Sequence, residues 1–132
     1  MNIKIVTPLG VEYSERDCAY VLVHDERNGS FGMLNNHLPV ISTVRSGYVA
    51  VTKENKDTDY IALAGAIVRN MDDEISITCE SIAFGKTKDE ALIAFSNLLE
   101  IRRQENRERN IELALAENTL KKEIKKTGAG HL

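Results

Sequence analysis

The hydrophobic pattern of this chain changes once, near Gly85, and that change limits the possible fold more than any other feature. Before Gly85, short runs rich in β-branched residues alternate with turns, and in residues 75–79 apolar and polar side chains alternate as in a half-buried strand. After Gly85, apolar residues recur every three or four positions, as on one face of a helix. The sequence therefore predicts an α+β protein with a β domain over residues 1–86 and a helical domain over residues 87–132.

The β region reads as about eight to ten short strands, a number and spacing typical of an antiparallel β-sandwich or barrel. The small residues Ala64, Gly65 and Ala66 predict a bulge or a close approach of two backbones. Proline cannot donate a hydrogen bond to a sheet, so the strand that follows Pro39 is expected to begin at a sheet edge.

The helical region begins with Thr87 and Glu90, which have the spacing of a capping box. Two apolar stripes follow, one before and one after the segment RRQENRERN, which contains no proline or glycine. A hairpin of two helices would bury the stripes against each other, whereas one helix of ~38 residues would extend ~57 Å and need a new partner for each stripe. We expect the hairpin. The stripes consist of Ala91, Leu92, Phe95, Leu98, Leu99 and Arg102, and of Leu113, Ala116, Leu120 and Ile124.

Composition excludes several classes of protein. The 132 residues suit one compact domain or a small domain with an appendage, and no apolar run approaches the ~20 residues that span a membrane. The amino terminus lacks a signal-peptide profile, which predicts a cytosolic chain unless a partner brings it to a membrane. The net charge of −3 argues against nucleic acid as a partner. Cys18 and Cys79 are expected to be buried and reduced, and no metal site is predicted.

Residues 28–47 form the most unusual segment, with several glycines, paired asparagines, a histidine and one proline. Glycine and asparagine adopt left-handed backbone conformations at low cost, so the segment predicts tight turns in a rigid surface loop. By itself the loop indicates no chemistry.

Together these features resemble the epsilon subunit of bacterial F-type ATP synthases. The family's loop pattern, G-x-F/L-G-I/M-L-x-x-H-x-P, corresponds to residues 29–39 of this chain. The family's second signature resembles residues 61–68, which are followed by a turn and another strand. The resemblance covers nearly the whole chain and implies a β-sandwich followed by a helical hairpin.

The resemblance implies a noncatalytic rotor subunit without a cofactor, at the foot of the central stalk. The sandwich would bind the gamma subunit on one side and, through its loop, the membrane ring of c subunits, coupling proton flow to ATP synthesis. Such a chain is peripheral to the cell membrane on its cytoplasmic side, and it reaches the membrane only through the complex. The residues implied for the c-ring contact are Ser30, Phe31, Asn35, Asn36 and His37. A histidine that bonds only its own loop is the alternative for His37.

The resemblance also implies that the helical tail either docks as a hairpin or extends along gamma. In the extended form its basic side chains would meet the beta (and alpha) subunits and restrain ATP hydrolysis. The residues implied for this regulatory face are Arg102, Arg103, Arg107, Arg109, Lys121, Lys122, Lys125 and Lys126. The alternative is an ordinary solvated charged surface.

Some family members bind ATP at the hairpin through the pattern I/L-D-x-x-R-A. In this chain Asp89 is retained, but Lys88 replaces the aliphatic residue and Leu92 stands where the arginine would be. A phosphate would lose its bidentate guanidinium partner, so no nucleotide site is expected.

Two other functions are consistent with the residues alone. One is a free-standing module that binds a nucleotide or a metabolite on the sandwich. The other is a small hydrolase that uses His24, Asp25 or His37, although no nucleophile or oxyanion arrangement accompanies them.

Overall fold

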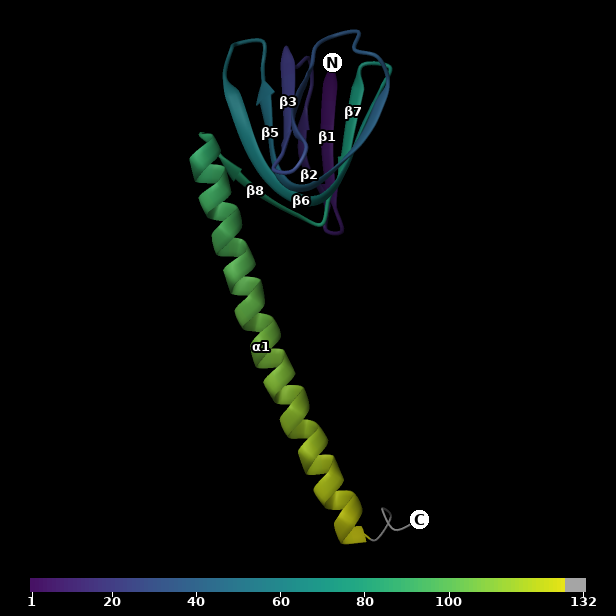
Figure 1. The fold of residues 1–132 in the computed structure, drawn as a ribbon, viewed down its shortest axis with the longest axis vertical. Helices are drawn as coiled ribbons and strands as arrows, with labels where there is room; N and C mark the ends of the chain where they lie inside the picture. Colours follow the sequence, from purple (N-terminus) through teal and green to yellow (C-terminus); the bar gives the residue numbers. More distant parts are fainter. Residues whose placement is uncertain (128–132) are drawn as a thin grey trace. The chain divides into compact units, whose positions relative to one another are not determined.

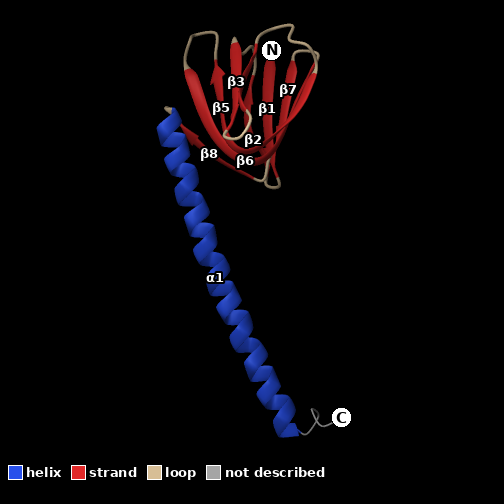
Figure 2. Cartoon of the chain, in the orientation of Figure 1, coloured by secondary structure: helices blue, strands red, loops and turns tan. Residues whose placement is uncertain are grey.

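The computed structural model describes residues 1–127, which form eight strands and then one helix (Figures 1 and 2). The strand number lies within the predicted range. The elements are β1 Asn2–Thr7, β2 Gly10–Glu15, β3 Tyr20–Asp25, β4 Gly29–Met33, β5 Val40–Thr52, β6 Thr58–Met71, β7 Glu74–Thr78, β8 Ser81–Gly85 and α1 Lys88–Thr127.

The eight strands form one continuous sheet that folds into two layers, because the long strands β5 and β6 pass through both. The first layer contains β2, β1, β7, the amino-terminal half of β5 and the carboxy-terminal half of β6. The second layer contains β4, β3, β8 and the remaining halves of β5 and β6. The domain is therefore a β-sandwich, as predicted (Figure 1).

Gly65 lies in β6 where the strand passes from one layer to the other. Its φ is +61°, a left-handed conformation that favours glycine, and a Cβ there would lie 2.8 Å from the Glu80 carboxyl carbon. The run of small residues thus allows a close approach at Gly65, but the approaching group is the Glu80 side chain and not the second backbone that was predicted. The edge predicted after Pro39 is also present, because residues 40–44 pair only with β6 whereas residues 47–52 pair with β3 as well.

One pairing corrects the prediction of a purely antiparallel sandwich, since β1 and β7 are parallel. Their register places Ile3 opposite Ile75 and Ile5 opposite Ile77. A parallel pair needs a long connection, which β2 to β6 supply here. No local sequence pattern marks such a pairing.

The core between the two layers is aliphatic. Tyr13 and Phe31 pack at its margins, and the Tyr13 hydroxyl donates a 2.7 Å hydrogen bond to Asp59 Oδ2. The buried core consists of Ile3, Ile5, Cys18, Val21, Val23, Met33, Val44, Val49, Val51, Ile61, Leu63, Ala66, Val68, Ile75, Ile77 and Cys79.

The predicted two-helix hairpin is wrong, because residues 88–127 form one continuous helix of 40 residues. The segment RRQENRERN contains good helix formers and no residue that breaks the backbone ladder, so nothing local ends the helix there. The start agrees with prediction in the cap at Thr87, while the return bond of the box goes to the Lys86 N–H in place of the Thr87 N–H. The Glu90 N–H donates to Thr87 Oγ1 over 3.1 Å, while the Glu90 carboxylate accepts a 3.0 Å bond from the Lys86 N–H.

The chain divides into two compact units, Met1–Ser96 and Asn97–Leu132. The first two turns of α1 therefore belong to the same unit as the sandwich. The boundary predicted between residues 86 and 87 lies beside the start of α1. Whether the regions on its two sides are independent domains stays a prediction.

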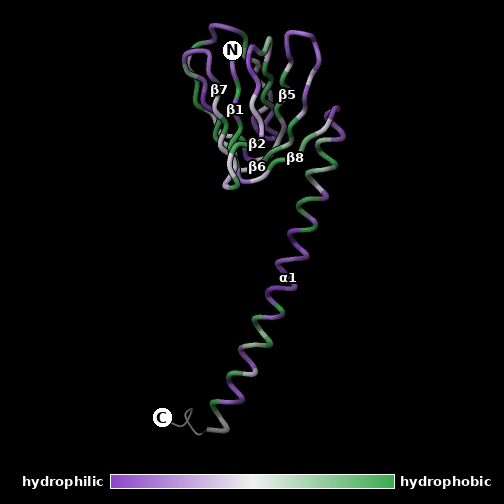
Figure 3. Tube along the Cα trace, turned by 180° about the vertical axis from the view of Figure 1, so that it is seen from behind, coloured by the Kyte–Doolittle hydropathy of each residue, from purple (hydrophilic) through white to green (hydrophobic). Residues whose placement is uncertain are grey.

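The two apolar stripes of the tail lie on one face of the continuous helix. Steps of three or four residues lead from Phe95 and Leu98 through Arg102, Asn106 and Arg109 to Leu113 and onward. Three polar side chains therefore interrupt a single apolar face, and hydrophilic and hydrophobic segments alternate along α1 in Figure 3.

Candidate functional site

The structure divides the predicted contact loop into two places. Ser30 and Phe31 lie in β4, next to the tight end of the β3–β4 hairpin, whereas Asn35, Asn36 and His37 follow the other end of β4. Phe31 is the middle residue of β4, and the five extended residues span ~16 Å, so Ser30 lies near one end of the strand and the three later residues lie beyond the other. The loop is thus a hairpin and a separate turn.

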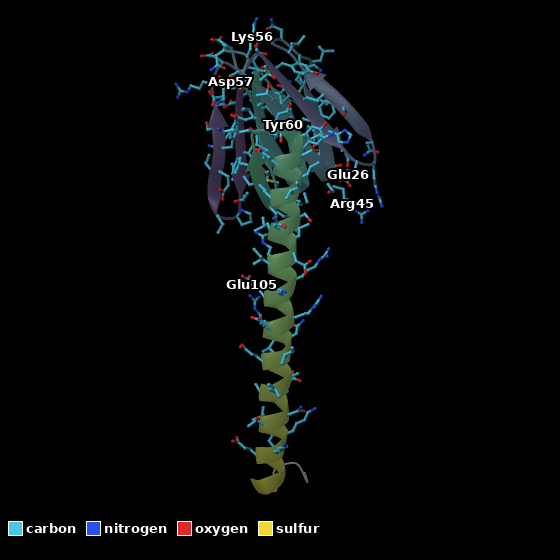
Figure 4. All side chains as sticks on the ribbon, turned by 90° about the vertical axis from the view of Figure 1, so that its left-hand side faces the viewer. Glu26, Arg45, Lys56, Asp57, Tyr60 and Glu105 are labelled. Atoms are coloured by element: carbon cyan, nitrogen blue, oxygen red, sulfur yellow. The ribbon has the colours of Figure 1, made fainter. Side chains whose placement is uncertain are left out.

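The hairpin end is held by short bonds within the chain. The Asp25 carboxylate is buried and accepts a 2.8 Å bond from Asn28 Nδ2, and the Glu26 N–H donates to the Ser46 carbonyl over 3.0 Å. A Cβ on Gly47 would collide with the His24 carbonyl oxygen. These contacts hold β3, the hairpin and β5 together, so the hairpin presents a firm surface. Figure 4 shows the labelled side chains of Glu26 and Arg45 on this part of the sandwich.

Ser30 is exposed, and its Oγ lies 2.6 Å from His24 Nδ1 on the paired strand. The His24 ring also contacts Tyr48, with 4.9 Å between the ring centroids. Phe31 is only half-exposed and packs against the core. Its ring therefore anchors β4, and only part of it is accessible to a partner.

The second turn is fixed by Asn35, Asn36 and His37. Asn36 has a φ of +64°, and its N–H donates a 2.7 Å bond to Asp73 Oδ1. Asn35 Oδ1 accepts a 2.7 Å bond from the Met1 ammonium group. The His37 N–H donates to the Leu34 carbonyl over 3.2 Å, while His37 Nδ1 lies 2.7 Å from the Leu38 carbonyl. The histidine thus bonds its own turn, which favours the structural interpretation, and it is still exposed.

The three candidates for hydrolytic chemistry do not form one unit. His24 and Asp25 are adjacent on β3 and therefore point to opposite faces, and the Asp25 carboxylate bonds Asn28. His37 lies beyond the far end of β4. The two thiols are poor nucleophiles, because burial raises the pKa of Cys18 and raises that of Cys79 to about 11.

The first layer carries an exposed apolar surface that is not among the predicted sites. Along β6 the residues alternate, and Ile67, Arg69 and Met71 point outward. They line a hollow of about 510 Å³ with residues of β7, and Ile41 of β5 is paired opposite Arg69. Ile41 is 71% exposed and Ile67 53%, which is unusual for large aliphatic side chains on a sheet. The sequence pattern that could have predicted this surface is the presence of apolar residues, Ile67 and Met71, at the outward positions of an alternating strand.

The predicted regulatory residues lie along α1. At 100° per residue, Arg102 and Arg109 lie in line with the apolar stripes, Arg103 lies beside that line and Lys122 lies on the opposite side. The basic side chains are thus distributed around the helix, and Arg103 lies 4.0 Å from Glu100. The side chains of Lys125 and Lys126 lie outside the described ones. Asp89 is exposed in the first turn and Leu92 is half-buried.

The helix does not have the composition of a membrane span. No helix within residues 1–127 combines the length and the hydropathy needed to cross a bilayer.

Comparison with known proteins places these observations in a family. Residues 1–85 match the family model described as "ATP synthase, Delta/Epsilon chain, beta-sandwich domain". The chain is 29% identical over 125 residues to an ATP synthase epsilon chain of Staphylococcus aureus (strain JH9), covering 92% of this chain and 90% of that one. It is 31% identical over 81 residues to an ATP synthase epsilon chain of Macrococcus caseolyticus, covering 61% of this chain and 59% of the relative.

Two solved structures share the fold at low identity. A chain of the Euglena gracilis mitochondrial ATP synthase aligns with a TM-score of 0.56 at 14% identity, covering 62% of this chain and 51% of that one. A chain of the Tetrahymena thermophila mitochondrial ATP synthase, from a structure of its central stalk and c-ring, aligns with a TM-score of 0.51 at 15% identity, covering 62% and 64%. The resemblance drawn from the loop and the small-residue strand is confirmed, and the chain belongs to the ATP synthase delta/epsilon family as an epsilon chain, a noncatalytic subunit of the F-type ATP synthase.

Proposed function

We propose that this chain is a rotor subunit of the central stalk, which couples proton flow through the c-ring to ATP synthesis. The firm hairpin end beside Ser30 supports this function, because torque passes between subunits without slippage only through stiff contacts. The Asp25 and Glu26 bonds and the close approach at Gly47 supply that stiffness. In the complex the chain is peripheral to the cell membrane, on its cytoplasmic side.

Two surfaces of the sandwich serve two partners in this proposal. The hairpin end carries Ser30 and contacts the c-ring, while the outward face of β6 and β7 contacts gamma. The apolar side chains of Ile41, Ile67 and Met71 favour a protein partner on that face, since large exposed apolar patches mark interaction sites. Asn35, Asn36 and His37 lie at the other end of β4, so in this proposal they form a second place of contact with the ring, apart from Ser30.

Cross-linking in assembled membranes tests both assignments. A cysteine introduced at Ser30 is expected to cross-link to a c subunit. A cysteine introduced at Ser76 of β7, which lines the same hollow as Ile67 and Met71, is expected to cross-link to gamma. Cys18 and Cys79 are buried and serve as an unreactive background. Cross-linking of both new cysteines to the same partner would contradict the division into two surfaces, and reaction with neither partner would contradict the rotor function.

We also propose that the tail restrains ATP hydrolysis through its exposed stripe and its basic residues. Leu113 and Leu120 are each 57% exposed, and a helix face of this kind needs a partner to bury it. Because Ala91 and Phe95 are buried, removal of the tail is better made after Ser96 than after Lys86. The shortened subunit is expected to assemble and to raise the ATPase rate of the complex. Deletion of residues 128–132 alone is the control, and an unchanged rate after the larger deletion would remove the regulatory role.

A further inference from the structure

We propose that a hollow between the edges of the two sheet layers binds a small organic cation, an aromatic ring that carries an ammonium group. The hollow has a volume of about 430 Å³, and the residues that line it all belong to the unit Met1–Ser96. These residues differ from those of the c-ring and gamma surfaces proposed above. The inference therefore holds or fails independently of the rotor function.

Three aromatic residues line the hollow, and they come from both layers. Tyr13 lies in β2, at the edge of the first layer, and Phe84 lies in β8, at the edge of the second. The centroids of their rings are 6.3 Å apart, and the ring planes are inclined by 33°. Tyr60 of β6 is the third aromatic residue. Phe84 is 47% exposed, so a ligand in the hollow can reach its ring.

Contacts within the chain fix the shape of the hollow. The Tyr13 hydroxyl donates its 2.7 Å bond to Asp59 Oδ2, which ties β2 to β6 at this side of the sandwich. A Cβ on Gly85 would collide with the Ala91 backbone nitrogen, so the end of β8 lies directly against the first turn of α1. Because these contacts exist without a ligand, binding requires little ordering of the walls.

The charged groups of the hollow favour a positive ligand. The carboxylates of Asp59 and Glu90 line it, together with the single ammonium group of Lys86. The Glu90 carboxylate accepts a 3.0 Å bond from the Lys86 N–H, an uncharged donor that leaves its negative charge in place. Asp59 is partly neutralised, because Lys53 Nζ lies 3.0 Å from its Oδ2. Lys86 is exposed, and its long side chain can keep the ammonium group in water. Glu90 is therefore the main anchor for a cation.

Aromatic rings beside a carboxylate are suited to an ammonium group. The faces of aromatic rings attract cations, and a carboxylate adds a charge-assisted hydrogen bond. A volume of about 430 Å³ lies in the range of small-molecule sites and exceeds what an ammonium group alone would fill. The rest of the ligand is therefore apolar, and a flat ring matches the walls made by Tyr13 and Phe84.

An anion would favour a different place on the same side of the sandwich. A neighbouring hollow shares Asp59, Tyr60 and Lys86 with the first one, and two further lysines, Lys53 and Lys56, line it. A phosphate compound would be attracted there, and it would be repelled by Glu90. The sign of the ligand's charge thus distinguishes the two hollows.

Two probes with the same ring and opposite charge test the proposal on the full ¹⁵N-labelled chain. Tryptamine is expected to shift the amide signals of Tyr13, Phe84 and Gly85 saturably, with a Kd of about 1 mM or tighter, as is ordinary for a ligand of this size. Indole-3-propionate is expected to bind at least about tenfold more weakly, because it meets the Glu90 carboxylate. Stronger binding of indole-3-propionate, or saturable shifts of the same amides by ATP, would overturn the proposal. Tryptamine shifts that stay linear up to about 10 mM would overturn it as well.

Substitutions locate the cation in the hollow. Glu90→Gln removes the charge and keeps an acceptor for the Lys86 N–H, so it should weaken tryptamine binding about tenfold while the helix cap remains. Glu74→Gln is the matched control, at an exposed glutamate that lines the hollow of β6 and β7, and it should leave the Kd unchanged. Equal weakening by the two variants would show a general attraction to the chain's negative charge and would contradict a site.

Two further variants test the ring and the like charge. Phe84→Ala removes one aromatic wall and should also weaken tryptamine binding about tenfold. Lys86→Gln removes the repelling ammonium group and should tighten it about twofold to threefold, a gain that a damaged fold would not produce. Weaker binding in Lys86→Gln, or an unchanged Kd in a folded Phe84→Ala chain, would contradict the assignment.

Discussion

The sandwich and the distal part of α1 are stabilised in different ways. Up to Ser96, strands distant in sequence pair with one another and bury an aliphatic core, as in the parallel pair of β1 and β7. From Asn97 onward, backbone hydrogen bonds join residues four apart, and large side chains such as Leu115 are 62% exposed. The sandwich thus carries its own core, whereas the distal helix offers an apolar face whose burial depends on something else. The difference suits the coupling and regulatory functions proposed above for the two regions.

One substitution made in both regions tests this contrast with the largest expected effect. Ile77→Ala opens a cavity in the core, where Ile77 is 1% exposed, and is expected to lower the free energy of unfolding by about 2–5 kcal/mol. Ile111→Ala changes a side chain that is 59% exposed, and the expected effect is within about 0.5 kcal/mol. Urea unfolding of the two variants measures both values. A similar loss in both would show that the distal helix is packed in the free chain.

Local rules predicted the features of this molecule that depend on neighbouring residues. They gave an unusual backbone at the small residues around Gly65, the helix cap at Thr87 and the sheet edge after Pro39, and each depends on the chemistry of a few adjacent residues. The parallel β1–β7 pair could not be predicted, because it depends on how residues far apart meet. The single helix replaced the hairpin because local propensity favours helix throughout RRQENRERN.

The sequence predicted which residues belong to the candidate site, but it did not predict how they are arranged in space. The residues Gly29–Met33 lack strict alternation, so the sequence marked a loop where the structure has β4. That strand separates Ser30 from Asn36, which sequence distance alone places close together. The exposed face at Ile67 could not be predicted in the same way. Alternation along a strand shows which residues share a face, but it does not show which of the two faces is covered by the rest of the protein.

Gly65→Ala tests whether the bend in β6 depends on glycine. The alanine would adopt an unfavourable positive φ and crowd the Glu80 side chain, so we expect a loss of about 1–2 kcal/mol. Thermal unfolding of Gly65→Ala, Glu80→Ala and the double variant separates the two causes. If crowding matters, the double variant loses less than the sum of the single ones, and strict additivity would assign the loss to the backbone alone.

Alkaline pH should weaken the sandwich. Burial and the hydrogen bond to Asp59 raise the pKa of Tyr13 above its ordinary value, and burial raises that of Cys79 to about 11. A group with a raised pKa stabilises the fold fully below its unfolded-state pKa, and that contribution is lost as the pH rises toward the folded-state value. The free energy of unfolding should therefore fall above about pH 9, where unfolded thiols and then phenols ionise. Urea unfolding from pH 8 to 11 measures the decline, and Tyr13→Phe should make it shallower. A decline of the same steepness in the variant would assign it to other groups.

The smallest effect is expected at the turn between β6 and β7. Asp72 and Asp73 have φ values of +53° and +59°, a pair of left-handed residues typical of a type I′ turn, in which asparagine is preferred at the first position. Asp72→Asn should therefore raise the free energy of unfolding by about 0.5 kcal/mol, measured as a small rise in Tm. Asp73→Ala is the contrasting change, because Asp73 Oδ1 accepts the 2.7 Å bond from the Asn36 N–H and its loss should destabilise the fold. If Asp72→Asn also destabilises, the Asp72 carboxylate has a favourable electrostatic role that outweighs its turn geometry, and the sandwich depends on charge at this end as well as on its core.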